Sequence, residues 1–235
     1  MRKTSKIYLV GIAVAALATI TAPAASYVLD NGSISTALNA SDGTEPRDNW
    51  FANEFTAVPN AELLTRVDFG VFTTAGTPNS ASVVIYRVTG AGGNPALGAT
   101  RIYTQGFTPL AGDGTNAFLQ QINLTTPVAL NDGDKFLVSV FMPDVIGLPP
   151  NDKYPYLLDT SGVATGTYWD RSNPGMFNLD DLSGAKPIDQ LLSGGSWHPD
   201  AGHVFIRVEA IPEPSAFALA GLVAATLAIF RRRAG

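Results

Sequence analysis

Apolar and polar residues alternate through much of the chain, with the two-residue period that places every second side chain of a strand on the buried face. The run 82–88 is short and β-branched, and further strands are expected around 99–107, 118–124 and 203–209. The run 135–142 is almost entirely apolar, which predicts a central strand covered on both faces. In the run 63–72 the alternation predicts a buried face formed by Leu63, Thr65, Val67, Phe69 and Val71.

Segments rich in glycine, proline and asparagine separate the expected strands. A turn is expected around Gly133, where a positive φ suits glycine. Shorter strands are expected at 154–158 and 166–169, whereas 173–197 is expected to be irregular with one helical turn near 187–192. Eight to ten strands and no convincing amphipathic helix predict an all-β fold, specifically an antiparallel β-sandwich of jelly-roll type.

Both ends of the chain differ from this pattern. Residues 1–25 begin with a basic stretch, continue with an apolar run at 7–20 and end in Ala22-Pro23-Ala24. This order predicts a secretory signal peptide, cut by signal peptidase near Ala24 or Ala25. A retained membrane helix is the alternative interpretation of the same run.

The last 25 residues combine three features in a fixed order. Pro212, Glu213 and Pro214 prevent a regular helix and favour an extended, accessible segment. An uncharged apolar run at 215–230 follows, short for a membrane-spanning helix, and then the cluster Arg231, Arg232 and Arg233. A plain C-terminal membrane anchor is one interpretation, but such an anchor does not need the two prolines.

The complete tail resembles the PEP-CTERM sorting signal of Gram-negative bacteria. The resemblance covers only 211–235, and it implies recognition by an exosortase and cleavage near the motif. Until that cleavage, the C-terminal helix would hold the protein in the membrane. Two processed ends imply an exported protein of the cell envelope, cell surface or extracellular matrix.

Without its ends the chain is strongly acidic. Residues 26–211 contain nine Lys or Arg and 19 Asp or Glu, a net charge of −10, whereas the whole chain has −5. Nucleic acid is therefore an unfavourable partner. The chain lacks cysteine, so the exported part must be stabilised by its own core. We expect a polar lead at 26–49, with little regular structure beyond one short strand, and a single β domain at 50–210.

Several blocks of the body carry a second resemblance. They are similar to the lectin-like β-sandwich domain found beside bacterial papain-like cysteine peptidases, and to the choice-of-anchor domains of other sorted surface proteins. The blocks are 50–55, 62–69, 83–86, 122–138 and 205–208. The chain departs from the family pattern after Thr167-Tyr168-Trp169, where Phe177 and Asp181-Leu182 precede a long insertion. The resemblance implies no sugar-binding residues that can be transferred.

Catalytic and metal-binding motifs are weak. The two histidines, His198 and His203, lie in no nucleophile motif, and we expect no enzymatic activity and no catalytic residues. Calcium is the cofactor that an acidic exported domain could bind, through loop oxygens. The alternative interpretation is that the acidic and amide residues of these loops lie in solvated turns and bind no metal. The candidate ligands, including those for a histidine-bound metal, are Asp42, Asp48, Asn49, Asp170, Asn173, Asp180, Asp181, His198, Asp200 and His203.

Aromatic residues are concentrated in the loop-rich second half. Sugar rings stack on exposed aromatic side chains, so a polysaccharide is a candidate partner. The alternative interpretation is that these aromatic residues pack under the long loops and form a small second core. The candidate stacking residues are Tyr154, Tyr156, Tyr168, Trp169, Phe177 and Trp197.

These observations predict a surface protein with a structural or adhesive role and no catalytic activity. A module that captures polysaccharide is the alternative, and a hydrolase is a remote one.

Overall fold

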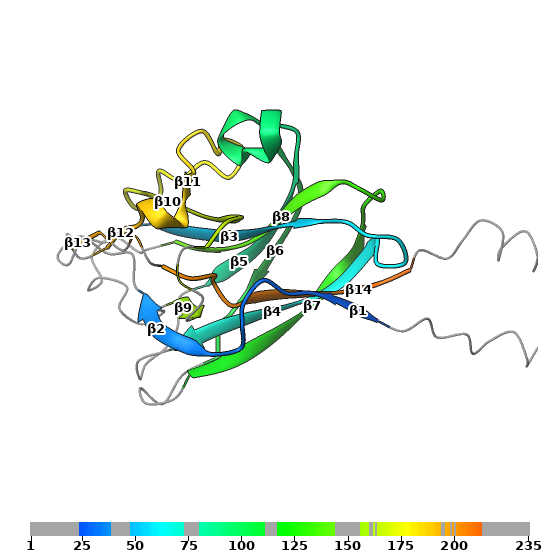
Figure 1. Ribbon diagram of the computed structural model, residues 1–235, viewed down its shortest axis with the longest axis horizontal. Coiled ribbons are helices and arrows are strands. Elements are labelled where there is room, and N and C mark those ends of the chain that lie inside the picture. Colours follow the sequence, from blue (N-terminus) through cyan, green and yellow to red (C-terminus); the bar gives the residue numbers. More distant parts are fainter. Residues whose placement is uncertain are drawn as a thin grey trace, which may run out of the picture.

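Two antiparallel sheets of six strands each form the body of the protein (Figure 1). The computed structural model describes residues 24–38, 48–72, 80–110, 117–143, 156–159, 162, 164–193, 196–197, 199 and 201–212. The expected signal helix and sorting helix lie outside these residues. Within the described part of the chain, no helix is both long and apolar enough to cross a membrane.

The first sheet has the order β1-β14-β4-β9-β2, and β7 pairs with β4 on its other edge. Its strands are β1 (Ala25–Tyr27), β2 (Ile34–Leu38), β4 (Leu63–Phe72), β7 (Ala117–Ala129), β9 (Tyr156–Asp159) and β14 (Ile206–Ile211).

The second sheet has the order β11-β10-β3-β8-β5-β6. Its strands are β3 (Asp48–Thr56), β5 (Ala81–Val88), β6 (Ala99–Phe107), β8 (Lys135–Met142), β10 (Thr167–Ser172) and β11 (Lys186–Pro187). A separate ribbon pairs β12 (Leu192–Ser193) with β13 (Ser196–Trp197). Three 3₁₀ turns complete the described elements: Ala91–Gly93, Pro95–Leu97 and Ile188–Gln190.

The central position expected for 135–142 is confirmed. β8 lies between β3 and β5, and Phe136, Leu137 and Val138 are completely buried. A strand with neighbours on both edges and cover on both faces has no position that favours water, which explains its apolar sequence. The expected turn before it is also confirmed, because Gly133 has a φ of 82°.

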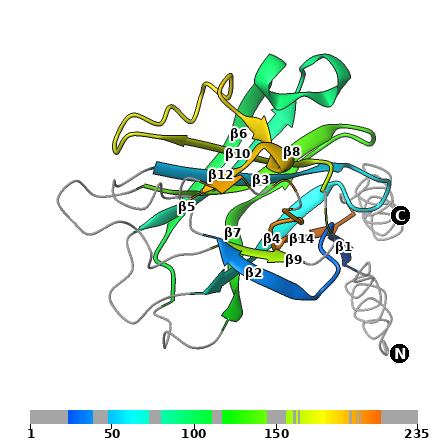
Figure 2. The ribbon, with the colours of Figure 1, turned by 60° about the vertical axis from the view of Figure 1, so that its left-hand side comes forward.

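The main core lies between the two sheets, which face each other in Figure 2. The second sheet contributes Phe51, Ile85 and Phe136, and the first contributes Leu64 and Phe69, all fully buried. Each such side chain contributes roughly 1.5–3 kcal/mol relative to leaving it exposed.

A bulge corrects the face predicted for 63–72. Leu64 is completely buried, whereas Leu63 and Thr65 are only partly so; at Val67 and Phe69 the predicted face is buried. The register of β4 with β7 shifts between Leu64 and Arg66, and the register of β14 with β4 shifts between Glu209 and Ala210. An extra residue in a strand reverses the side-chain alternation, which brings Leu64 to the core.

A second apolar cluster covers the outer face of the second sheet. Trp50, Tyr86 and Leu137 lie on the sheet, and the segment 173–185 packs over them through Leu182 and Ala185. Residues 173–185 hold no strand, but the rest of the run 173–197, which was expected to be irregular, contains the short strands β11, β12 and β13. The 3₁₀ turn at Ile188–Gln190 confirms the predicted helical turn. The described residues hold fourteen strands, several of them only two or three residues long, so eight to ten was too few.

The lead before Trp50 is more regular than expected. It contains two strands, β1 and β2, where one short strand was expected. β1 adds to the edge of the first sheet, and Tyr27 enters the main core against Phe55 and Phe136.

Candidate functional site

The two ends of the β domain are hydrogen-bonded neighbours. β1 pairs antiparallel with β14, with Ala25 opposite Ala210 and Tyr27 opposite Val208. β14 ends at Ile211, immediately before Pro212. The expected signal cleavage point and the expected sorting motif therefore begin side by side, at one end of the first sheet. Residues 1–23 and 213–235 themselves lie outside the described residues.

Tyr27 fastens β1 to the domain. Its hydroxyl donates to the carbonyl oxygen of Ala61 at 2.7 Å and accepts the N–H of Val58 at 3.1 Å. Burial of the ring raises the pKa of the phenol, so it remains a neutral donor. A strand of only three residues is thereby held by side-chain bonds in addition to its ladder.

A polar network crosses the core next to β14. Asn53 is completely buried and donates to the carbonyl oxygens of Val204 at 2.7 Å and Ile206 at 3.3 Å. The hydroxyl of Thr167 donates to Asn53 Oδ1 at 2.8 Å and lies 2.7 Å from Nδ1 of His203. The network joins β3, β10 and β14, elements from both sheets.

This cluster resembles a catalytic triad in composition but differs in geometry. Asp159 is 1% exposed, and its carboxylate accepts the backbone N–H groups of His203 at 2.9 Å and Asn31 at 2.8 Å. Thr167 is completely buried and gives its hydrogen to Asn53, so it cannot reach a substrate from this position. Burial lowers the pKa of the His203 imidazole, although Asp159 and Asp30 oppose this change. The arrangement supports the backbone between β9 and β14.

An ion pair attaches the lead to the same region. Arg207 Nε donates to Asp30 Oδ2 at 2.8 Å, and a second guanidinium nitrogen contacts Oδ1. The Asp30 side chain is fully enclosed, and Arg207 also lies 5.4 Å above the ring of Phe205. A bidentate pair of this type resists rotation, and it holds the turn after β1 against β14.

Trp169, a candidate for sugar stacking, belongs to the main core. It is 4% exposed, and the cationic groups of Arg171 and Lys186 lie 5.8 Å and 5.9 Å from its ring centroid. Its indole N–H has no hydrogen-bond partner in the described structure. The ring is therefore covered in this conformation.

Tyr168 and Phe177 pack against the second cluster. Phe177 stacks on Trp50 with ring centroids 6.4 Å apart and lies 5.1 Å from Phe141. Burial and the nearby carboxylate of Glu54 raise the pKa of Tyr168 to about 12. Tyr154 lies outside the described residues, and the side chains of Tyr156 and Trp197 are not described. Among the candidates whose side chains are described, Tyr168 and Phe177 thus lie on the outer face of the second sheet, and Trp169 lies in the main core.

The candidate metal ligands have separate roles where they are described. Asp180 pairs with Arg101 at 2.9 Å, Asp181 accepts the N–H of Ser183 at 3.0 Å, and Asp170 accepts that of Arg171 at 2.7 Å. Burial raises the pKa of Asp170, whereas the N–H of Ser183 lowers that of Asp181.

Other candidate ligands serve the backbone or lie elsewhere. Asp48 accepts the N–H groups of Gly175 and Phe177 at 2.8 Å and 3.3 Å. Asn49 and Asn173 have partners of their own. Among the described residues, no three acidic or histidine side chains gather as a metal site. Asp42, His198 and Asp200 lie outside those residues.

A groove of about 440 Å³ opens between β1 and the end of β3. Val28 and Val58, which are 44% and 47% exposed, lie on its lining. Glu54 and Phe55 of β3 also line it. The groove offers apolar contact, and it adjoins the strand that begins the domain.

No protein-family model matches this chain, and no curated protein matches it.

Sequence reasoning did not single out several of the residues that organise this region. Asp30, Asn53, Asp159 and Thr167 were treated as ordinary strand or loop positions, although each is at least nine-tenths buried. Asn53 is a polar residue between buried neighbours in β3, and this position was the one sequence signal that could have indicated a buried hydrogen-bond network. Its partners Val204 and Ile206 are about 150 residues away in sequence, and no local pattern reveals them.

Proposed function

We propose that this chain is an exported, exosortase-sorted protein of the cell surface or extracellular matrix, with a structural or adhesive β domain. The pairing of Ala25 with Ala210 carries the proposal. It means that the β domain extends from the expected signal cleavage point to the residue just before the tail. A cut after Ala24 would leave β1 whole, and a cut after Ala25 would remove only its first residue.

The tail is the part of the sequence that would direct the protein to the cell surface or extracellular matrix. The motif Pro212-Glu213-Pro214 follows the last residue of β14, and Ile211 is still paired with Leu63. A protease needs an extended substrate, and two prolines keep the segment out of both helix and ladder. Exosortase and signal peptidase are the proposed processing partners, with membrane attachment through the C-terminal helix before cleavage.

The test is replacement of Pro212, Glu213 and Pro214 by alanine in the full chain, expressed in a Gram-negative host that carries an exosortase. The unchanged chain should lose its tail and reach the surface or the medium. The variant should remain in the membrane fraction at the higher, uncleaved mass. Identical masses and locations for the two proteins would disprove sorting by this motif.

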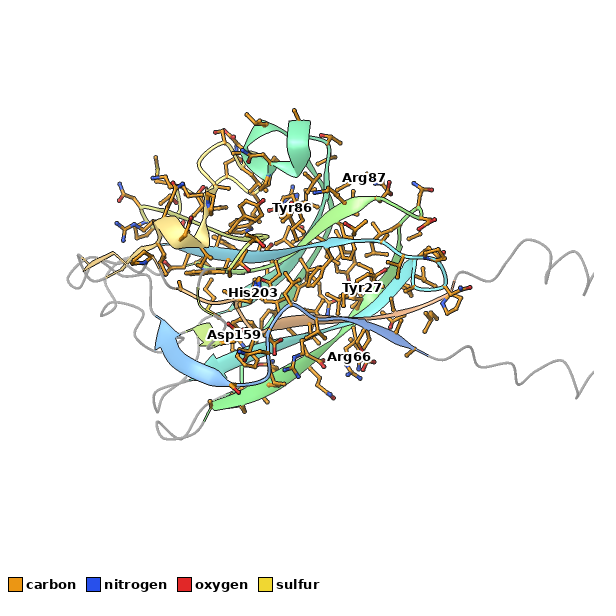
Figure 3. All side chains as sticks on the ribbon, viewed as in Figure 1. Tyr27, Arg66, Tyr86, Arg87, Asp159 and His203 are labelled. Atoms are coloured by element: carbon orange, nitrogen blue, oxygen red, sulfur yellow. The ribbon has the colours of Figure 1, made fainter. Side chains whose placement is uncertain are left out.

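For the domain itself we propose a jelly-roll β-sandwich without catalytic activity. In support, the chain passes repeatedly between two facing sheets. The Thr167 hydroxyl is bonded to Asn53, and Asp159, which lies beside His203 in Figure 3, accepts backbone N–H groups. An experimental structure of the processed protein would test the topology.

Capture of polysaccharide is the second candidate function, and the groove beside β1 favours it. A glycan array probed with the processed protein, with and without calcium, would test this function. Binding that is lost when Val58 is replaced by aspartate would support it. Binding that persists in that variant would exclude this groove.

A further inference from the structure

β7 presents an unpaired edge. β4 covers one edge of β7, from Leu63 opposite Ala129 to Phe72 opposite Ala117. Along the other edge, among the described residues, no strand is paired with it. Thirteen residues make β7 the longest described strand. Such an edge is a template for another strand unless it is blocked.

The direction of the backbone groups follows from one hydrogen bond. Gly70 of β4 donates its N–H to Phe205, on the side away from β7. Its partner Leu119 is therefore in a non-hydrogen-bonded pair, and it directs both its N–H and its C=O outward. Because every second residue of a strand directs its backbone groups to the same edge, the N–H and C=O groups of Ala117 and Gln121 also point outward.

Side chains of β6 block the next part of this edge. Gln105 Nε2 donates to the carbonyl oxygen of Asn123 at 3.1 Å, and the N–H of Thr125 reaches Gln105 Oε1 at 2.8 Å and the Tyr103 hydroxyl at 2.9 Å. These contacts confirm that the backbone N–H and C=O groups of the odd-numbered residues of β7 point away from β4. Pro127 and a register shift protect the remainder. The open part is thus confined to 117–121.

The composition of the β7 edge and its surroundings favours a second copy of this chain as the partner. Residues 102–110 and 117–129 contain no charged side chain, although the body carries a net charge of −10. Two copies of an acidic domain repel each other over most of their surface, and an uncharged edge is where they can approach. Leu119 and Leu110, which are 40% and 57% exposed, lie beside this edge. Lysine, the usual protection of an edge strand, is absent from it.

We propose that two copies of this chain associate by antiparallel pairing of their β7 edges, about a two-fold axis at Leu119. In this register Ala117 faces Gln121 of the second copy, and Leu119 faces its own counterpart. Every outward N–H and C=O of the three residues then meets a partner. The two first sheets become one continuous sheet. This inference deepens the proposed structural or adhesive function, on which it rests, by naming a second copy as a partner.

A cysteine cross-link in the full exported chain tests the proposal. The chain has no cysteine, so Leu119→Cys introduces a single thiol. Opposed residues of an antiparallel pair have Cα atoms about 5.5 Å apart, within the range that a disulfide spans. A disulfide-linked dimer should form in the oxidising periplasm and disappear on reduction. Thr126→Cys, in the blocked part of β7, is the matched control and should give at least about tenfold less dimer.

Two further variants test the backbone pairing in the Leu119→Cys chain. Gln121→Pro removes an outward N–H and leaves the β4 ladder intact, so it should reduce the dimer at least about tenfold, whereas Gln121→Ala should not. A dimer that survives Gln121→Pro, forms equally with Thr126→Cys or never forms would overturn the proposal. The mass of the reduced chain reports tail cleavage separately, so failure of sorting and failure of pairing are distinguishable.

Discussion

The hydroxyl oxygen of Thr167 and Nδ1 of His203 lie 2.7 Å apart, and the surrounding bonds assign the hydrogen between them. Asn53 uses its amide N–H groups on backbone carbonyls, so its oxygen faces Thr167 and accepts the hydroxyl hydrogen. Thr167 then has no hydrogen left for the imidazole and must accept one. Neutral His203 therefore carries its proton on Nδ1.

This environment predicts a dependence of stability on pH. Burial lowers the pKa of His203 in the folded state below its unfolded value of about 6.5, so the unfolded chain binds more protons. The contribution of His203 to the free energy of unfolding should be constant above about pH 7.5 and should decrease as the pH falls through about 6.5, where the unfolded chain takes up a proton first. Urea unfolding at a series of pH values measures the effect.

His203→Asn should flatten this pH profile, because the asparagine amide can still donate to Thr167 but does not titrate. His198→Asn, at the other histidine, is the control and should retain the slope. A slope that persists in His203→Asn and vanishes in His198→Asn would contradict the assignment.

The buried amide of Asn53 should be important for stability. Asn53→Ala removes the amide hydrogen bonds to the carbonyl oxygens of Val204 and Ile206 and the acceptor of the Thr167 hydroxyl, and should lower the free energy of unfolding by about 2–4 kcal/mol. Thr167→Val, which keeps the shape, should cost about 1–2 kcal/mol. Thr126→Ala on the exposed part of β7 should change it by less than about 0.5 kcal/mol. Equal effects at all three positions would refute a structural network.

The bulge in β4 predicts opposite sensitivities for two adjacent leucines. Leu64→Ala removes a completely buried side chain and should cost about 2–5 kcal/mol, whereas Leu63→Ala, at a half-buried position, should cost less than about 1.5 kcal/mol. Chemical denaturation of both variants measures the difference. The reverse order would restore the face predicted from simple alternation.

Trp169 should behave as a core residue. Trp169→Ala should cost about 3–5 kcal/mol through the cavity it creates, whereas Trp169→Phe, which removes an unpartnered N–H, should cost less than about 1.5 kcal/mol. In a chain whose other tryptophans are replaced by phenylalanine, acrylamide should quench the Trp169 fluorescence weakly. Strong quenching, further reduced by a polysaccharide, would instead indicate a stacking surface.

Local patterns were sufficient to predict most strands, because the buried positions of a strand are apolar and its exposed positions are polar. The run 135–142 has no polar face, and the structure places it in the middle of a sheet. The same reasoning failed at Leu64, because a bulge depends on how two strands are paired and leaves no clear mark in either one. It also underestimated the lead, since the pairing of β1 depends on a partner 185 residues later.

The candidate site was less predictable than the strands. Sequence reasoning identified His203, but it connected this residue with His198 and Asp200 as a metal site. The structure places it beside Thr167 and Asp159, which come from other strands. Of the described aromatic candidates, Trp169 and Tyr168 do not share a surface, because they are adjacent on β10 and so point to opposite faces of its sheet.

The sequence by itself determined the all-β class, the central position of β8 and the net acidity of the body, because periodicity and charge are local properties of the chain. It also carries the motifs of both ends, whose processing remains a proposal to be tested. The tertiary structure alone showed that Ala25 lies opposite Ala210, that Asn53 closes a network around His203, and that no strand among the described residues pairs with the outer edge of β7 at 117–121. Each of these depends on contacts between residues far apart in sequence, and such contacts are selected by the packing of the whole domain.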